Sequence, residues 1–492
     1  MDKQTFASSA IWKIAEALST KGIALVISII LARILLPQDY GIVTLTAVFI
    51  NLSTILVQSG LGTALIRKDK LEEVDYNNGF MMGFVVAVIC YFVFFFGAPI
   101  ISSFYKAPML TPVLRIQMLS LFLVAFGNIQ TVIITREFRF KELCFANIIA
   151  NSISGVAGVV MAYVGFGVWA LVFYTLLRDG ISNLVLFTRI KWHPGLHIDY
   201  TRMKSLLGFS IWVLIATMVD FIGNNYTSAL LGKEYSLSEL GLYSKGYQIP
   251  EMICLYTFGA ISSVLLPTFS VYQNDKDALK RVVKRLVEMS CYIIFPMMVG
   301  LALISTRLVP FLFTDKWSAC VPVFIFACVS FGVNPLRSIN MQLIYALGNS
   351  KKCLLVESIR SFLLVVGITL CAIVFKSSIY GIAAVAAGVA IINIFITQLL
   401  VKKYIEYGFI EWMKDMAPTI LLCLAMGAIV VLAGMIPAHR YVVMFIQIVA
   451  GGAVYLLLSV LTRNRSFLEV KNIIMERIRN RSRRACVEGD NE

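Results

Sequence analysis

The fold is decided by residues 25–71, which read LVISIILARILLPQDYGIVTLTAVFINLSTILVQSGLGTALIRKDKL. An apolar run ends at Leu36, a polar turn follows, and a second apolar run continues to Ile66, where a charged cluster begins. Roughly 20 apolar residues span the hydrocarbon core of a bilayer. The pattern therefore predicts two membrane spans, a tight turn between them and a basic loop after them. Asp39 is expected to be the N-cap of the second helix.

The same plan returns about 200 residues later. Residues 236–241 (SLSELG) align with residues 36–41 (LPQDYG), acid on acid and glycine on glycine. Two halves that begin alike suggest a duplicated membrane transporter. We expect a first six-helix lobe, a cytoplasmic linker, a second six-helix lobe, two further helices and a basic cytoplasmic tail, over residues 1–190, 191–207, 208–403, 404–461 and 462–492.

Composition places the whole chain in a membrane. Of its 492 residues 59% are hydrophobic and only 14% are charged, and the mean hydropathy is +0.82. A transmembrane barrel would show short alternating segments instead of long apolar runs. The net charge of +15 is typical of lysine- and arginine-rich cytoplasmic loops, so no nucleic-acid partner is expected. The ten cysteines form no CxxC pair and are read as small hydrophobic residues.

Fourteen spans are predicted, with boundaries near residues 12–36, 41–64, 79–101, 112–135, 144–164, 168–188, 208–231, 241–268, 286–306, 320–347, 354–375, 379–401, 417–436 and 441–461. With the N-terminus inside, the inward loops and the tail carry 28 lysines and arginines, against six in the outward loops. This asymmetry supports the even number of spans and predicts a multi-pass protein with both termini in the cytoplasm. The tail from residue 462 fits either an amphipathic surface helix or a solvated basic segment.

Charged residues inside the spans are the candidate site residues. Each costs roughly 2.5–3.5 kcal/mol at a helix centre, so such residues are expected to face a wet cavity or a partner. Eight are basic and five are acidic: Lys13, Lys21, Arg33, Arg115, Arg178, Lys245, Arg337 and Arg360, with Glu16, Asp179, Asp220, Glu251 and Glu357.

Depth and helical phase sort these residues. Arg33, Arg115 and Lys245 lie near the outer ends of their spans, where interfacial anchoring competes with a cavity role. The deeper charges either line a cavity or form structural ion pairs between helices. Polar stripes at spacings of three, four and seven follow the first and seventh spans, and they include Lys13, Lys21, Asp220 and Asn224. Packing through small polar residues also gives stripes, but it does not need lysine or aspartate.

The surplus of cations predicts an anionic cargo, because arginine and lysine suit phosphate and carboxylate. We expect substrate binding by Lys21, Arg178, Arg337, Lys13, Arg360, Asn224 and Lys245. The candidates for ion coupling, or for weakening the grip on the cargo, are Asp220, Asp179, Glu251 and Glu357. No phosphate-binding loop, zinc set or GxSxG motif occurs, so we expect transport and not an enzyme, with no cofactor and no metal.

Several motifs resemble the polysaccharide transporters of the multidrug/oligosaccharidyl-lipid/polysaccharide (MOP) exporter superfamily. They are LARILLPQDYGIV (31–43), QSGLGTALIRKDKLEEVDYNNGF (58–80), REFRFKEL (136–143), GFGVWALV (165–172), ELGLYSKGYQIPE (239–251), SSVLLPTFS (262–270) and LFTDKW (312–317). The likeness runs over about residues 8–400 and is strongest to the lipopolysaccharide, colanic-acid and teichuronic-acid exporters.

The resemblance implies an all-α, two-lobed, V-shaped (MATE-like) fold that works by alternating access through a cationic central cavity. It implies a flippase for undecaprenyl-diphosphate-linked oligosaccharide, with membrane lipids and polysaccharide polymerase or assembly proteins as partners. Two alternatives stay open. An ion-coupled multidrug or organic-cation antiporter of the same fold would need an anionic cavity. A membrane-embedded polymerase or ligase would need a large outward loop or a catalytic carboxylate near the outer face.

Overall fold

A computed structural model of the protein describes residues 3–58, 65, 72–190, 192–195, 199, 214, 217–218, 221–469, 471 and 475. All regular structure in these ranges is helical. The chain divides into two compact units, Met1–Ser244 and Lys245–Glu492. The predicted division at a linker over 191–207 stays a prediction, because most of that linker lies outside the described ranges.

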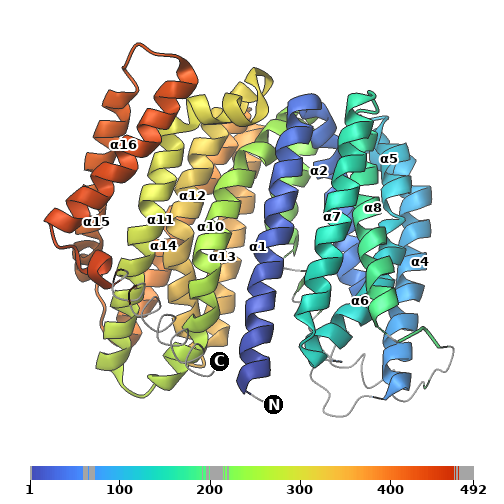
Figure 1. Cartoon of the computed structure of the whole chain (residues 1–492), viewed down its shortest axis with the longest axis horizontal. Helices are drawn as coiled ribbons and strands as arrows, with labels where there is room; N and C mark the ends of the chain where they lie inside the picture. Colours follow the sequence, from blue (N-terminus) through green and yellow to red (C-terminus); the bar gives the residue numbers. More distant parts are fainter. Residues whose placement is uncertain are drawn as a thin grey trace, which may run out of the picture. The chain divides into compact units, whose positions relative to one another are not determined.

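Helix pairs organise the first unit (Figure 1). α7 packs along α1 on one side and along α8 on the other, while α4 packs against α5 and α6. A further helical stretch covers residues 221–234. The named helices are α1 (Lys3–Ile34), α2 (Pro37–Gln58), α4 (Glu73–Phe104), α5 (Leu110–Gln117), α6 (Ser120–Glu137), α7 (Phe140–Tyr163) and α8 (Val168–Arg189).

The second unit is built in the same way. α12 packs between α11 and α14, and α15 packs against both α11 and α16. α10 begins in the first unit and continues into the second. The elements are α10 (Leu237–Val271), α11 (Lys276–Phe313), the 3₁₀ turn η1 (Asp315–Cys320), α12 (Val321–Ala346), α13 (Ser350–Thr369), the π-helical turn η2 (Leu370–Val374), α14 (Ile379–Ile405), α15 (Phe409–Ala433) and α16 (Arg440–Leu461).

The described residues contain 11 helices long and apolar enough to cross a membrane, or 12 if the bent pair within α10 is one span. Each corresponds to a span predicted from the sequence. The other two predicted spans are 12–36, most of which lies in α1, and 208–231, part of which lies outside the described residues. The protein is thus an all-α, polytopic membrane protein, as predicted.

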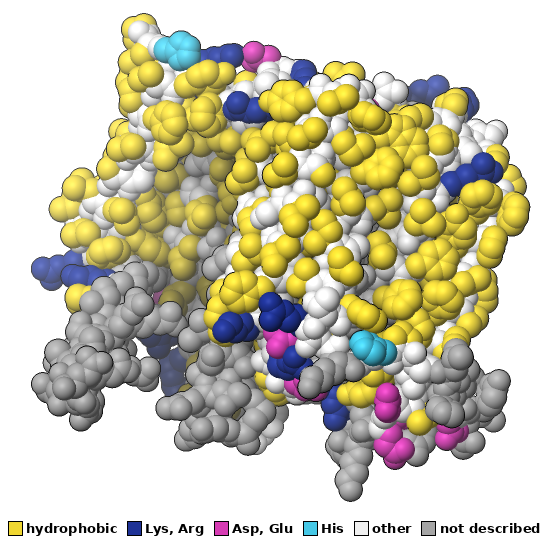
Figure 2. Space-filling view, turned by 45° about the vertical axis from the view of Figure 1, so that its right-hand side comes forward, with side chains coloured by type: hydrophobic (Ala, Val, Ile, Leu, Met, Phe, Trp, Pro, Cys, Tyr) yellow, Lys and Arg dark blue, Asp and Glu magenta, His cyan; other side chains and the backbone are white. Residues whose placement is uncertain are grey.

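α7 shows why these helices pack as they do. Its buried face carries small residues, and Gly155 and Gly158 lie against Ile27 of α1 and Tyr174 of α8. Small residues let helix backbones approach closely where the lipid supplies no hydrophobic driving force. Large apolar side chains instead point outward. Figure 2 shows that hydrophobic side chains cover most of the face in view, and that most of the charged side chains lie near its upper and lower borders.

The turn that opens α2 differs from the prediction in one respect. α2 begins at Pro37, so Asp39 is the third residue of the helix and not its N-cap, and that prediction is wrong. The carboxylate of Asp39 accepts a hydrogen bond from the backbone N–H of Leu36 (3.0 Å). Glu239 does the same for Ser236 (3.0 Å), and the hydroxyl of Ser236 accepts from the N–H of Glu239 (3.2 Å), which completes a capping box. Proline at the first helical position explains the shift, because it needs no N–H partner.

The two repeated turns contact each other inside the first unit. A Cβ placed on Gly41 would overlap the carbonyl oxygen of Leu237, and a Cβ on Gly241 would overlap that of Pro37. The contact is reciprocal, as between subunits related by a two-fold axis. Glycine occupies both equivalent positions because only it allows the two backbones to come this close.

Candidate functional site: polar clusters inside the spans

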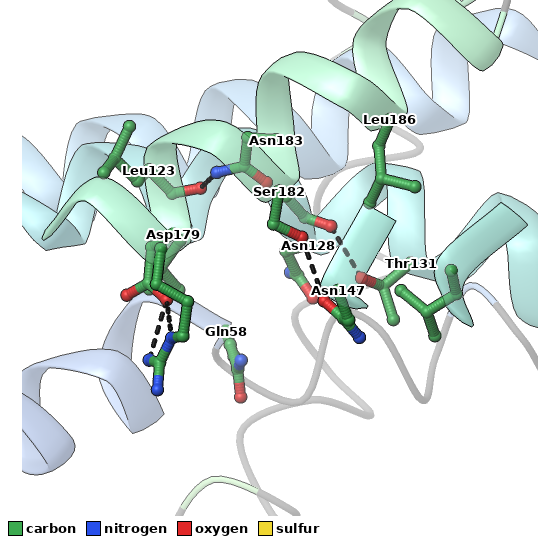
Figure 3. A pocket seen from close by; sticks show the side chains of 13 residues that line it. Gln58, Leu123, Asn128, Thr131, Asn147, Asp179, Ser182, Asn183 and Leu186 are labelled. Carbon is green, nitrogen blue, oxygen red and sulfur yellow. Dashed lines mark hydrogen bonds and ion pairs between the residues drawn. The ribbon is translucent and has the colours of Figure 1, made fainter. Parts of the chain in front are cut away.

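A polar pocket lies among α2, α6, α7 and α8 of the first unit (Figure 3). Its volume is about 410 Å³. α6, α7 and α8 contribute side chains at one-turn spacing and α2 contributes Gln58, so that amides and hydroxyls gather on the faces that meet. The polar lining consists of Gln58, Asn128, Thr131, Asn147, Arg178, Asp179, Ser182 and Asn183.

Asn147 is the centre of this pocket's hydrogen-bond network. Its amide nitrogen donates to the carboxylate of Glu16 on α1 (2.8 Å), and its amide oxygen accepts from the hydroxyl of Ser182 on α8 (3.0 Å). Asn183 donates to the backbone carbonyl of Leu123 on α6 (2.6 Å). Four helices are therefore joined by neutral groups around a single carboxylate from α1. Such a lining offers both donors and acceptors, which is what a sugar hydroxyl requires.

Arg178 and Asp179 form an ion pair on one edge of the pocket. Both the Nε and an Nη of Arg178 donate to the same carboxylate oxygen of Asp179, at 2.9 and 2.8 Å. The side chains are 39% and 29% exposed, so each keeps a surface open to the pocket. The two neighbours on one helix cancel each other's charge, and the pocket as a whole stays close to neutral.

A second cluster, in the second unit, is positively charged. Glu357 on α13 accepts a hydrogen bond from Arg337 on α12 through one carboxylate oxygen, and from Arg360 through the other (2.7 Å). Asn334 accepts from the Nε of Arg337 (3.3 Å). The arginines are 28% and 20% exposed and the glutamate 29%. Two guanidinium groups share one carboxylate, so these three side chains together carry a formal charge of +1.

Comparison with known proteins identifies the family. A model of the family described as "Polysaccharide biosynthesis protein" matches residues 30–322, more than half of the chain. The chain belongs to the polysaccharide biosynthesis protein family. The resemblance to polysaccharide transporters seen in the sequence is thereby confirmed.

Two relatives and one solved structure place this family member more closely. The chain is 23% identical to the teichuronic acid biosynthesis protein TuaB of Bacillus subtilis, over 82% of this chain and 85% of that one. It is 23% identical to the lipopolysaccharide biosynthesis protein WzxC of Escherichia coli, over 68% and 67% of the two chains. Its fold is similar to that of the lipid II flippase MurJ in an inward closed conformation, with a TM-score of 0.72 and 16% identity over 92% of this chain and 99% of the other.

The remaining site residues predicted for this family member lie elsewhere. Lys21, Asn224 and Glu251 are exposed. Lys245 is 2% exposed; its ammonium donates to Gln248 (2.8 Å) and lies over the ring of Phe313. The side chain of Lys13 and all of Asp220 lie outside the described part of the chain. The assignment of these residues to substrate binding or ion coupling stays a prediction.

Sequence reasoning missed the neutral members of the first cluster. It singled out charges because their cost in a membrane is conspicuous, and so it passed over Asn147, Ser182 and Asn183. The available signal was spacing: Ser182 follows Arg178 by four residues, and Asn147 and Asn151 are also four apart. Such pairs lie on one helix face. The three-residue spacing of Glu357 and Arg360 likewise indicated their ion pair, but their contact with α12 could not be read from the chain.

Proposed function

We propose that this protein is a flippase that moves a lipid-linked oligosaccharide, an undecaprenyl-diphosphate-linked repeat unit of a surface polysaccharide, across the bacterial cytoplasmic membrane by alternating access. The observation that carries the proposal is the cluster of Arg337, Glu357 and Arg360. Charges inside apolar helices are costly, and here two arginines stand beside one carboxylate, a surplus of positive charge that suits an anionic cargo. A diphosphate supplies that anion.

The polar pocket of the first unit supports the sugar half of the proposal. Amides and hydroxyls that include both donors and acceptors suit the hydroxyl groups of an oligosaccharide. Arg178 can reach an acidic sugar while Asp179 holds it in place. The transported molecule has the same two chemistries, a charged diphosphate and a neutral or acidic glycan.

The acidic residues then have two kinds of role in this proposal. Asp179 and Glu357 are counterions that the cargo displaces from the arginines, which keeps the grip reversible. Asp220 and Glu251 remain proposed coupling sites for an ion. Lys13, Lys21, Asn224 and Lys245 remain proposed contacts along the route.

The roles given in the names of the similar proteins support this assignment. One acts in teichuronic acid biosynthesis, one in lipopolysaccharide biosynthesis, and the similar fold belongs to a flippase of lipid II. We further propose that both termini face the cytoplasm, because the inward loops hold most of the lysines and arginines. Polymerase or assembly proteins that use the exported repeat unit are the proposed partners.

The test is complementation of a deletion strain. Variants Arg337→Gln and Arg360→Gln are expressed at equal levels, and both the surface polysaccharide and the lipid-linked intermediate on the inner leaflet are measured. We expect at least a tenfold loss of surface polymer with accumulation of the intermediate. The matched control is Arg440→Gln, which breaks an exposed ion pair between the first residue of α16 and Asp315 (2.8 Å) and should leave export unchanged.

Normal polymer output from both arginine variants would remove this cluster from the mechanism. Resistance to organic cations that is lost with the gene, together with unchanged surface polymer, would instead establish the antiporter of the same fold. Elongation of lipid-linked sugars by the purified protein would identify a polymerase.

A further inference from the structure

A second pocket on the first unit has the chemistry of a phospholipid site. It lies between the start of α7 and the end of α8 and has a volume of about 420 Å³. Two of its lining residues are the exposed cations Lys141 and Arg189, and the rest of its wall is mainly apolar, with Phe145, Ile149 and Val185. Because Lys141 is the second residue of α7 and Arg189 the last of α8, both cations sit where the apolar segments end.

The acids near this pocket are already engaged. Glu142 accepts from Arg139 through both carboxylate oxygens (2.8 Å each), and Glu137 accepts from the same guanidinium (2.8 Å). Within the described residues neither Lys141 nor Arg189 takes part in an ion pair; the Lys141 ammonium lies 5.6 Å from the centre of the Trp12 ring. The two cations are therefore available to an external anion.

Arg139 also fixes the geometry of the pocket. Its guanidinium donates to the backbone carbonyl of Arg189 (3.0 Å) while it holds Glu142 on α7. The end of α8 is thereby tied to the start of α7. This contact involves the side chain of Arg139 and the backbone of Arg189. It therefore keeps Lys141 and Arg189 at the mouth of the pocket, the opening between the start of α7 and the end of α8, without using either of their side chains.

An exposed apolar stripe leads away from this mouth along α7. Its members recur every three or four residues, and their exposed fractions run from 40% to 74%: Phe145, Ile149, Ile153, Val156, Val160 and Tyr163. From the first to the last the helix rises about 27 Å, which is close to the ~30 Å of a bilayer's hydrocarbon core. Acyl chains that lie along this stripe place a headgroup phosphate at the cations.

We propose that the mouth between α7 and α8 is a binding site for an anionic membrane phospholipid. Its phosphate is held by Lys141 and Arg189, and its acyl chains lie on the α7 stripe. Charge complementarity selects the anionic class, since a zwitterionic headgroup brings its own ammonium to a site that already holds two cations. The site is separate from the polar pocket and from the arginine cluster of Glu357, and it does not depend on the proposed transport.

The experiment is native mass spectrometry of the full-length protein with phosphatidylglycerol or phosphatidylcholine added at equal concentration. We expect the wild type to retain phosphatidylglycerol preferentially. Each single variant, Lys141→Gln or Arg189→Gln, should weaken its binding about fivefold, and the double variant about 25-fold, in keeping with the usual contribution of a basic residue near an anionic lipid. Phosphatidylcholine binding should not change.

The matched control is Lys351→Gln with Lys402→Gln, which removes two exposed cations at helix ends of the second unit. It should keep the preference for phosphatidylglycerol. An unchanged preference in the Lys141 and Arg189 double variant would overturn the proposal. The double variant is also tested with undecaprenyl phosphate. If it loses undecaprenyl phosphate binding but keeps phosphatidylglycerol binding, the proposal is also overturned, because the site would then bind the isoprenoid lipid. Thermal unfolding without added lipid checks that each variant is folded.

Discussion

The polar pocket of the first unit and the arginine cluster of the second stabilise charged side chains within membrane-spanning helices in different ways. Both place costly polar groups within membrane-spanning helices. In the pocket the charges of Arg178 and Asp179 cancel on one helix, and the hydrogen bonds between helices are made by neutral amides. In the cluster, the ion pair of Glu357 with Arg337 joins α12 to α13, and the two arginines outnumber the single carboxylate. In the proposed function, the pocket of the first unit binds hydroxyl groups of the cargo and the cluster of the second unit binds its charged group.

The two repeated turns provide the contrasting case, in which the halves have stayed alike. Gly41 and Gly241 face each other's helix start, and the hydroxyl of Thr44 donates to that of Ser244, its equivalent 200 residues later (3.1 Å). Each residue at this contact packs against the equivalent residues of the other repeat, so a change in one repeat affects the packing of both. The polar clusters are not constrained in this way, and there the halves differ in chemistry.

The largest expected effect comes from removing the shared carboxylate. Glu357→Ala leaves two arginines close together in an apolar setting. Breaking a buried ion pair costs about 3–5 kcal/mol, and the partial exposure here reduces the loss to roughly 2–3 kcal/mol. The free energy of unfolding, measured with a chemical denaturant, and the amount of surface polymer should both fall sharply. A stable, active Glu357→Ala protein would show that the cluster does not depend on its anion and would end the contrast with the first unit.

Adding a methyl group at the symmetric contact should come next. Gly41→Ala and Gly241→Ala each force a Cβ onto a backbone carbonyl, at a cost of about 1–3 kcal/mol in unfolding free energy. The two variants should behave alike, because the contact is reciprocal. Gly97→Ala in α4 is the control, since nothing lies within 4 Å of its Cβ position. Unequal effects of the two substitutions would contradict the reciprocity.

Truncating the centre of the polar pocket should have a moderate effect. Asn147→Ala removes the bonds to Glu16 and Ser182, and it should lower stability by about 1–2 kcal/mol. If the pocket binds sugar, export should fall several-fold at equal protein level. Ser182→Ala removes only one of these bonds and should fall between Asn147→Ala and the wild type in both assays. Export at the wild-type level in the Asn147→Ala variant would argue against a binding role.

The smallest effect is expected from neutralising the pair in the first unit. The double variant Arg178→Gln with Asp179→Asn keeps the net charge and most of the hydrogen-bonding capacity, so stability should change by less than about 1 kcal/mol. The corresponding double variant, Arg337→Gln with Glu357→Gln, also keeps the net charge, but it removes the ion pair between α12 and α13 and the carboxylate that Arg360 contacts, so it should lose more export. Equal losses in the two double variants would erase the proposed difference between hydroxyl and charge recognition.

The sequence by itself determined the membrane class, the helical fold and most element positions. It could do so because bilayer thickness and helix rise set the length of each apolar run, and charges mark where the runs end. It also showed the 36–41 and 236–241 repeat, because identical spacing of an acid and a glycine is visible in one dimension.

Only the tertiary structure decided which polar groups meet. Nothing local joins Asn147 to Glu16 or Arg337 to Glu357, since these contacts depend on which helix faces are turned toward each other. Helix phase fixes the face a residue occupies on its own helix, but the neighbour across the interface is chosen by packing. For the same reason the pairing of Lys141 with Arg189 at one mouth could not be read from two helix ends 48 residues apart.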